Sequence, residues 1–245
     1  MRQSLARAWA IAKKDIRIYY LKGPVVIFGL LLPLFLYLAY AMGRSMAPKE
    51  AISSIMTMTV FFTSTAVGPV IAPWETRSRT FERLVSAPVS MADILLGDAV
   101  ASIIFGVLIT AAVALFGTLI GVSIANPALL AYNLLASSFC FSFLGLLLSS
   151  PPADTPANIM MLSSLLKFPM IFISGVFIPL SQMPEPARAV ALISPLTYTA
   201  ELSRQAVYAQ TTIPTPIAAA ALILYAVFFA AAAIKLHERS VPKRL

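Results

Sequence analysis

Charged residues are scarce in this chain of 245 residues: only 11% are Asp, Glu, Lys or Arg, whereas 59% are hydrophobic. A typical globular chain has about 25% charged residues, so a soluble domain could not hide this much apolar surface. The bilayer is therefore the solvent to consider, and each spanning helix needs about 20 apolar residues. We expect a single membrane domain over 1–245, with no separate soluble domain.

Cysteine and histidine each occur once, which limits the chemistry open to the chain. Cys140 lies within an apolar run, which excludes a disulfide framework and a Cys/His metal cluster. His237 lies near the C-terminal end, so neither a Ser–His dyad nor a His-based metal site is available inside the bilayer. The apolar segments also lack paired carboxylates. These absences argue against an intramembrane enzyme, and we expect the chain to bind no metal and no cofactor.

Long charge-poor segments predict an all-α integral membrane protein with six transmembrane helices in a core over 24–234. The turn signal Asn126-Pro127 separates the third span from the fourth. A capping box that begins at Ser90 marks the start of the third. The predicted spans are 24–42, 51–72, 91–124, 128–149, 158–178 and 215–234.

The segment 1–23 has an amphipathic pattern. Leu5, Trp9 and Ala12 recur at helical spacing, and the basic side chains fall largely away from this stripe. The pattern predicts a helix in the cytoplasmic interface, with its apolar side toward acyl chains. The alternative is a plain basic anchor that only sets topology.

The interval 179–214, between the fifth and sixth predicted spans, is moderately apolar and contains five prolines. Backbone at membrane depth must be hydrogen-bonded internally. We therefore expect short re-entrant helices on the extracellular side, one of which begins at Ser194-Pro195.

Basic residues predict the orientation. Thirteen Lys and Arg residues lie in 1–23, in 75–83 and in the tail 235–245, against four in the opposite loops. The positive-inside rule then places both termini in the cytoplasm of a multi-pass plasma-membrane protein. Because the net charge of +8 flanks hydrophobic segments, it indicates a lipid bilayer as partner and not nucleic acid.

The first cytoplasmic loop, 75–88, is short, polar and predicted to be helical around 80–85. We expect Phe81 to be exposed between Glu82 and other charged residues. An exposed aromatic of this kind suits a small plug that enters a groove on a partner protein. The alternative is a solvated loop with a snorkelling aromatic.

Two blocks carry a family resemblance. The run from Glu75 to Pro88, followed by Val89-Ser90 and Ile94-Leu95-Leu96-Gly97, resembles the first cytoplasmic loop of type-2 ABC-exporter permeases, such as drug-export and nodulation-factor permeases. Ile173 to Leu180, Met183-Pro184 and Ser194-Pro195-Leu196-Thr197-Tyr198 are similar to further signatures of that class, and Arg204 matches an arginine that often follows. The sequence departs from the pattern at Arg79, where glycine is usual, and at Asp98, where lysine is common.

The resemblance implies the permease subunit of an exporter. The apolar walls of the predicted spans favour an amphiphilic or lipid-like substrate. The resemblance also implies a dimer with a second permease copy and two copies of an ABC ATPase subunit, in which ATP and Mg²⁺ would be bound. This chain contains no phosphate-loop motif, consistent with ATP hydrolysis in a separate chain. The resemblance assigns coupling to the ATPase to Glu75, Arg77, Arg79, Phe81, Glu82, Arg83 and Leu84. It assigns an outer gate to Ser174, Gly175, Phe177, Pro179, Pro195 and Tyr198.

Lys167 lies about ten residues into the fifth predicted span, at a depth of about 15 Å. A charge at that depth marks a water-filled path or a paired site. We expect Lys167 and Asp98 to line the translocation route, where Lys167 meets an anionic or polar headgroup. The alternatives are a structural pair with Asp98 and a snorkelling lysine. At the level of function the alternative is a stand-alone secondary transporter, although such proteins usually carry more intramembrane acids than Asp98 alone.

Overall fold

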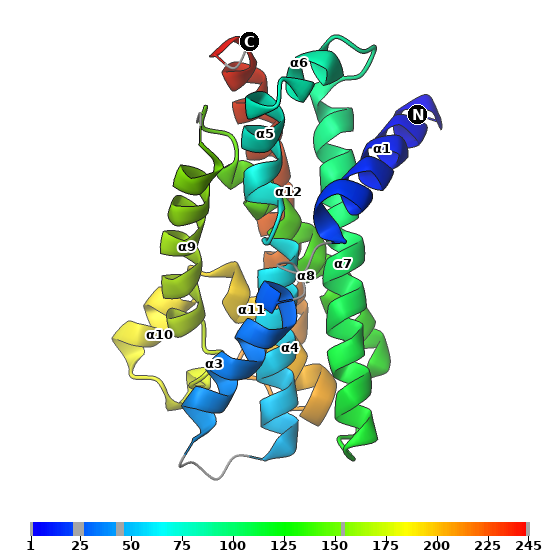
Figure 1. Ribbon diagram of the computed structural model, residues 1–245. Coiled ribbons are helices and arrows are strands. Elements are labelled where there is room, and N and C mark those ends of the chain that lie inside the picture. The colour runs from blue at the N-terminus through cyan, green and yellow to red at the C-terminus, as the bar shows by residue number, and fades with distance from the viewer. Residues whose placement is uncertain (1, 22–26, 43–46, 153–154, 244–245) are drawn as a thin grey trace.

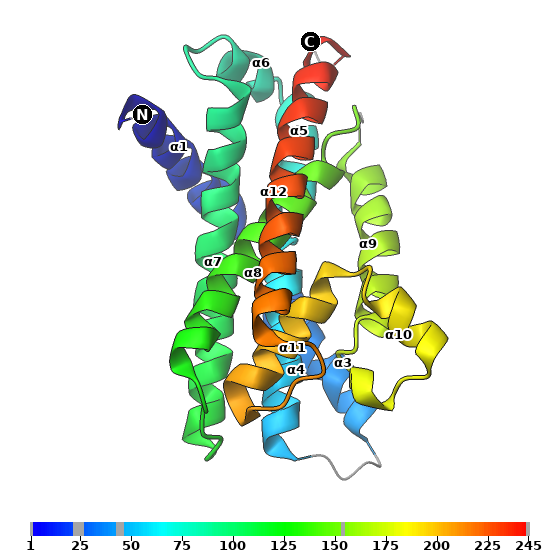
Figure 2. The same ribbon diagram turned by 180° about the vertical axis from the view of Figure 1, so that it is seen from behind.

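The computed structural model describes residues 2–21, 27–42, 47–152 and 155–243. Helices joined by short connections make up these residues, and no strand occurs among them, which confirms the all-α fold class (Figures 1 and 2). The helices are α1 (Arg2–Asp15), η1 (Ile16–Tyr20), η2 (Ile27–Leu31), α3 (Leu32–Ala41), α4 (Pro48–Ser64), α5 (Gly68–Arg77), α6 (Thr80–Val85), α7 (Met91–Leu119), α8 (Pro127–Leu148), α9 (Pro156–Ile173), η3 (Leu180–Gln182), α10 (Glu185–Ala191), α11 (Pro195–Tyr208), α12 (Thr215–Ser240) and η4 (Val241–Lys243).

Five helical stretches among the described residues are long and apolar enough to span a membrane: α4 with α5, and α7, α8, α9 and α12. The remaining predicted span, 24–42, contains a shorter apolar helix, Gly29–Ala39. Its predicted start at Pro24 lies outside the described residues, as do Arg44 in the next loop and residues 244–245 of the tail. A sixth crossing therefore stays a prediction.

Local sequence signals explain where these helices begin. Ser90 and Asp93 form the predicted capping box at the start of α7: Ser90 Oγ accepts from the Asp93 amide, and the Asp93 carboxylate accepts from the Ser90 amide. Asn126 caps α8 through a hydrogen bond from the Leu129 amide at 3.0 Å. The turn predicted at Asn126-Pro127 is thus confirmed.

The bundle is centred on α4, which packs against α7, α8 and α11. In the most apolar stretch of the span Pro48–Arg77, which α4 begins, 94% of the residues are buried. This span therefore lies inside the protein and not on a lipid-facing surface. α8 packs against α12 on the other side. The start of α1 and the end of α12 lie toward the end of the bundle that carries α6, whereas α10 and the start of α4 lie toward the opposite end (Figures 1 and 2).

The span Pro48–Arg77 is broken in its middle. Pro69 lies in the first turn of α5 and has no N–H to donate to the carbonyl four residues earlier, that of Thr65. The helix is therefore interrupted at 65–67. The Thr65 carbonyl instead accepts a hydrogen bond from Lys167 Nζ at 2.7 Å, so α9 supplies the missing donor.

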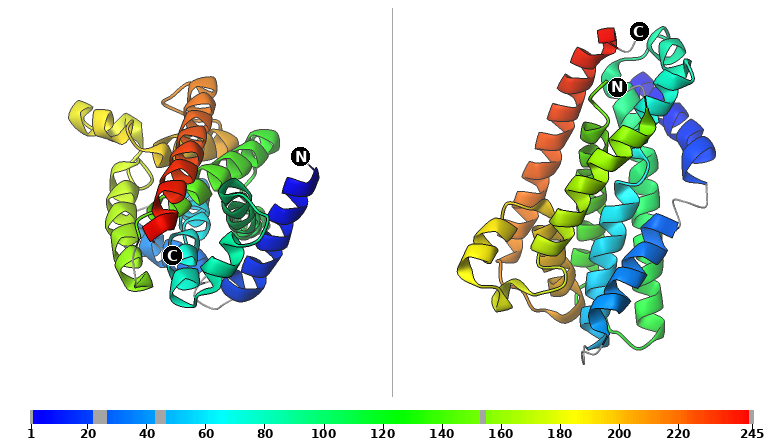
Figure 3. Two further views of the ribbon diagram at one scale, coloured as in Figure 1. Left: turned by 90° about the horizontal axis from the view of Figure 1, so that it is seen from above. Right: turned by 60° about the vertical axis from the view of Figure 1, so that its left-hand side comes forward.

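α1 lies along α7 at the edge of the bundle, as the view from above shows (Figure 3). The contact is close at Gly97, where an added Cβ would lie 2.6 Å from Cβ of Ile11. Near the start of α1, Ser4 donates to Asp93, and Arg7 lies 3.8 Å from the same carboxylate. The amphipathic helix predicted in 1–23 is thus anchored to α7.

A neighbouring face of α1 retains apolar exposure. Leu5 is 68% exposed and Trp9 is 56% exposed. An aromatic and an aliphatic side chain on one exposed helix face suit the boundary between headgroups and acyl chains. Immersion of this face in the interface stays a prediction.

Candidate functional site

The loop predicted to couple the chain to a partner contains one short helix, α6. Phe81 is only 2% exposed, so the prediction of an exposed aromatic plug is wrong. In a helix of six residues the apolar side chain turns toward the protein, and the polar ones are left outside. The exposed side is charged and consists of Arg77, Arg79, Glu82 and Arg83, with Leu84 half-buried.

Arg79 adopts a left-handed conformation, with φ 54° and ψ 24°, immediately before α6. For a residue with a Cβ this conformation costs roughly 1–2 kcal/mol, a cost that glycine avoids. Arginine therefore stands at a position where its backbone is strained and where the family pattern has glycine. The turn keeps its shape with arginine, and the charge adds to the exposed side of the loop.

Replacement of Arg79 by Gly should raise the free energy of unfolding by about 1 kcal/mol, because glycine relieves this strain. The measurement is thermal unfolding of the purified protein in detergent. Arg83→Gly is the matched control: it removes the same side chain within α6, where glycine costs about 1 kcal/mol. A loss of stability in both variants would contradict the strain at Arg79.

The loop is connected to α1 by a buried charge cluster. Lys14 contacts the carboxylate of Glu75 and lies 3.0 Å from that of Asp15. Asp98 of α7 lies beside Asp15, and all three acids are at most 4% exposed. Burial alone would lower the pKa of Lys14, but these carboxylates raise it above its ordinary range. Lys14 thus stays charged and joins α1 to α5.

The cluster changes the roles predicted for two residues. Glu75 is buried against Lys14, so it anchors the loop and does not contribute to its exposed side. Asp98 faces α1, whereas Lys167 donates to Thr65 in the broken span. The structure therefore does not bring Asp98 and Lys167 together, and the predicted structural pair between them is wrong. Distance along the sequence could not reveal that they face different helices.

Lys167 instead lines a cavity of about 580 Å³ between α3, the broken span and α9. Its walls are mostly apolar, including Phe62, Val70 and Phe168. At the side formed by η1 and α5, the rings of Tyr19 and Trp74 stack with centroids 5.4 Å apart. Burial raises the pKa of Tyr19 to about 12, so this hydroxyl is neutral.

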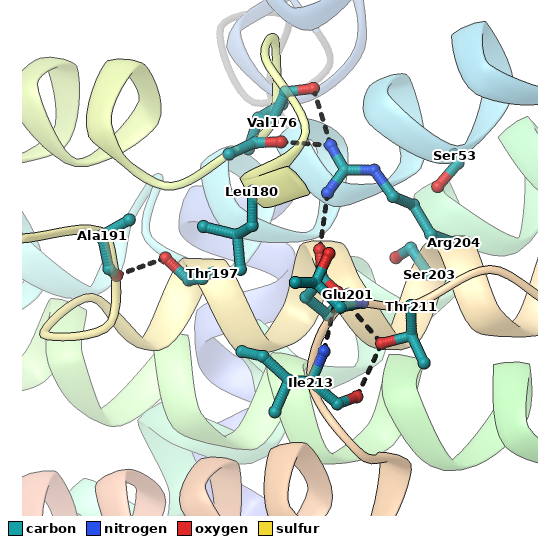
Figure 4. Close-up of polar contacts among 12 residues, drawn as sticks. Ser53, Val176, Leu180, Ala191, Thr197, Glu201, Ser203, Arg204, Thr211 and Ile213 are labelled. Atoms are coloured by element: carbon teal, nitrogen blue, oxygen red, sulfur yellow. Dashed lines mark hydrogen bonds and ion pairs between the residues drawn. The ribbon is translucent and has the colours of Figure 1, made fainter. Parts of the chain in front are cut away.

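A second buried polar centre lies at the opposite end of the bundle, on α11 (Figure 4). The guanidinium of Arg204 donates to Oε1 of Glu201 at 2.9 Å and to the carbonyls of Gly175 and Val176. The other carboxylate oxygen accepts from three groups after α11. These donors are Thr211 Oγ1 at 3.0 Å and the amides of Thr212 at 2.5 Å and Ile213 at 3.3 Å.

This centre holds part of the predicted outer gate. Gly175 has φ 73°, a conformation that glycine adopts without strain, and this turns its carbonyl toward Arg204. Ser174 is hydrogen-bonded to Ser194 at 2.6 Å. Sequence reasoning missed Glu201, although the spacing Glu201–Arg204 is typical of a helical ion pair.

The other predicted gate residues lie around it. Phe177 stacks on Phe172 with centroids 5.5 Å apart. Tyr198 donates to the Leu192 carbonyl at 2.8 Å. Pro179 precedes η3, and Pro195 begins α11, as predicted for a helix that starts at Ser194-Pro195.

Among the described residues, no group of three or more His, Cys, Asp or Glu side chains is placed to hold a metal ion. Comparison with curated individual proteins gave no match. Comparison with protein families matched residues 5–208 to the ABC-2 type transporter family. This match covers most of the chain, including the loop 75–88 and the segment 174–208. The chain therefore belongs to the ABC-2 type transporter family, as a multi-pass membrane permease component that works with an ABC ATPase.

Proposed function

We propose that this chain is the permease of an ABC exporter that moves an amphiphilic or lipid-like substrate out of the cytoplasm. Two copies would enclose the route and would bind two ATPase subunits, which hold ATP and Mg²⁺. The end of the bundle with α6 and both termini would face the cytoplasm, in accordance with the excess of basic residues there.

The observation that carries this proposal is the contact between Lys14 and Glu75. It connects α1 to the end of α5, directly before the exposed charges of α6. A partner that pushes on α6 would therefore move α1 and α5 together. α5 begins directly after the break at 65–67, and at this break Lys167 of α9 donates to the Thr65 carbonyl at the end of α4. Motion of the ATPase would in this way be transmitted to the broken span and α9, which line the cavity that contains Lys167.

The test exchanges charges on the exposed side of the loop. The tagged permease is purified from its native membrane as wild type and as Glu82→Lys/Arg83→Glu, and co-purified ATP hydrolysis is measured. The matched control is Glu238→Lys/Arg239→Glu, an exposed acid–base pair at the same end of the bundle. We expect wild type and control to retain an ATPase chain and the loop variant to lose at least 90% of the activity, because like charges now face the partner.

Two results would contradict the proposal. Equal loss in both variants would mean that overall charge, and not the loop, determines association. Absence of an ATPase chain from all three preparations would favour a stand-alone secondary transporter.

A further inference from the structure

The cavity between α3, the broken span and α9 combines apolar walls with a single charge. Among the described residues that line it, only Lys167 is charged. Its volume of about 580 Å³ falls within the range of small-molecule sites, which are mostly apolar with a few polar groups that fix orientation. The chemistry of those polar groups therefore indicates what the cavity can hold.

Lys167 donates a hydrogen bond to the protein but has no counter-charge among the residues that the structure describes. Its ammonium can donate three hydrogen bonds, and one goes to the Thr65 carbonyl. No ion pair among the described residues includes Lys167, because the buried acids beside α1 face Lys14. A charge at this depth is stable only with a counter-ion or water, so the cavity is electrostatically suited to one negative charge.

Ser163 adds a second polar group to the same cavity. It lies four residues before Lys167, on the same face of α9. It is only 2% exposed, and its Oγ has no hydrogen-bond partner among the described residues. An unsatisfied buried hydroxyl is costly, and this one lies where a bound group could accept a hydrogen bond from it.

We infer that this cavity binds an amphiphile with one acidic headgroup, a carboxylate or a phosphodiester, which contacts Lys167 and Ser163. The hydrocarbon part packs against the walls formed by Leu32, Phe62 and Phe168. One lysine balances one negative charge, so zwitterionic and neutral amphiphiles bind more weakly. This inference rests on the proposed function, because it names the substrate class of the proposed route.

The experiment uses the purified full chain in uncharged nanodiscs, with Trp9→Phe so that Trp74 is the only tryptophan. The probes are a dibrominated fatty acid and a dibrominated phosphatidylglycerol, whose bromines quench nearby tryptophan. The uncharged brominated methyl ester and brominated phosphatidylcholine are the controls. We expect saturable quenching of Trp74 by at least one acidic probe, and binding at least 10-fold weaker for each control. The two acidic probes distinguish a carboxylate from a phosphodiester.

Substitutions assign the contacts. Lys167→Met should weaken acidic binding at least 10-fold, Ser163→Ala a few-fold, and Lys167→Arg much less, because it keeps the charge. Lys13→Met, which removes an exposed lysine on α1, should change nothing. Because Lys167→Met also removes the Thr65 bond, Ser163→Ala provides an independent result in a fold that this substitution leaves intact.

Equal binding of acidic and uncharged probes, or unchanged binding in both Lys167→Met and Ser163→Ala, would overturn the inference. The charge of Lys167 would then be stabilised by water and not by an acidic ligand. Binding is measured here on the permease alone. If this binding assay fails but the co-purification test retains an ATPase chain, only the proposed ligand is rejected. Success without any ATPase partner would reject only the proposed function.

Discussion

Glu201→Ala should lower the free energy of unfolding by about 3–5 kcal/mol, the usual result of removing one partner from a buried ion pair. The guanidinium of Arg204, 6% exposed, would keep its carbonyl bonds but lose its only counter-charge among the described residues. The amides of Thr212 and Ile213 would also lose their acceptor. Thermal unfolding in detergent measures the loss.

Glu238→Ala is the matched control, because Glu238 is an exposed acid on α12 and its removal should cost under about 0.5 kcal/mol. Glu201→Leu/Arg204→Met removes both charges. It should cost less than the sum of the two single changes, because each single change leaves an unpaired buried ion and the double variant leaves none. Equal effects of Glu201→Ala and Glu238→Ala would show that the ion pair does not stabilise the contacts of α11 with 175–176 and 211–213.

Gly97→Ala should loosen α1 from the bundle. The new Cβ would lie 2.6 Å from Cβ of Ile11 and 2.8 Å from the Ala8 carbonyl oxygen, so the backbone of α1 must move away. Overpacking of this kind costs about 1–3 kcal/mol. A cost of about 1.4 kcal/mol corresponds to a 10-fold change in an equilibrium constant. We therefore expect amide hydrogen exchange in α1 to accelerate about 10-fold, and ATP-driven transport to fall with it.

The matched control is Gly68→Ala. An added Cβ there meets no atom closer than 3.4 Å, an ordinary contact, so exchange in α1 should stay as in wild type. If Gly97→Ala left exchange in α1 unchanged, close docking of α1 on α7 would be refuted. If exchange rose but transport did not fall, α1 would be dispensable for coupling.

The features that the sequence predicts well are local ones. The start of α7 follows from the capping box Ser90–Asp93, which is four residues long, and the turn before α8 follows from Asn126-Pro127. Charge-poor stretches long enough to cross a bilayer identify the five described spans because the hydrocarbon thickness fixes the number of residues required. Re-entrant character of 179–214 stays a prediction, although α10 and α11 are short helices there.

The features that the sequence predicts poorly depend on which helices pack against one another. Phe81 looks exposed in a charged loop, yet tertiary contacts bury it. The partners of Lys167 and Asp98 are separated by the arrangement of α1, α4 and α9, which no spacing encodes. Pro69 did offer a signal: a proline within a span removes one donor and so exposes the Thr65 carbonyl to another helix.

The interruption at 65–67 divides one membrane crossing into two rigid helical segments that meet at a hinge. Lys167 of the neighbouring helix α9 is hydrogen-bonded to this hinge. α5 has ten residues and is therefore a lever about 15 Å long. A tilt of about 10° at the hinge moves the far end of such a lever by about 2.6 Å, without breaking any hydrogen bond within α4 or α5. An uninterrupted helix would have to bend or rotate over its whole length to give the same displacement.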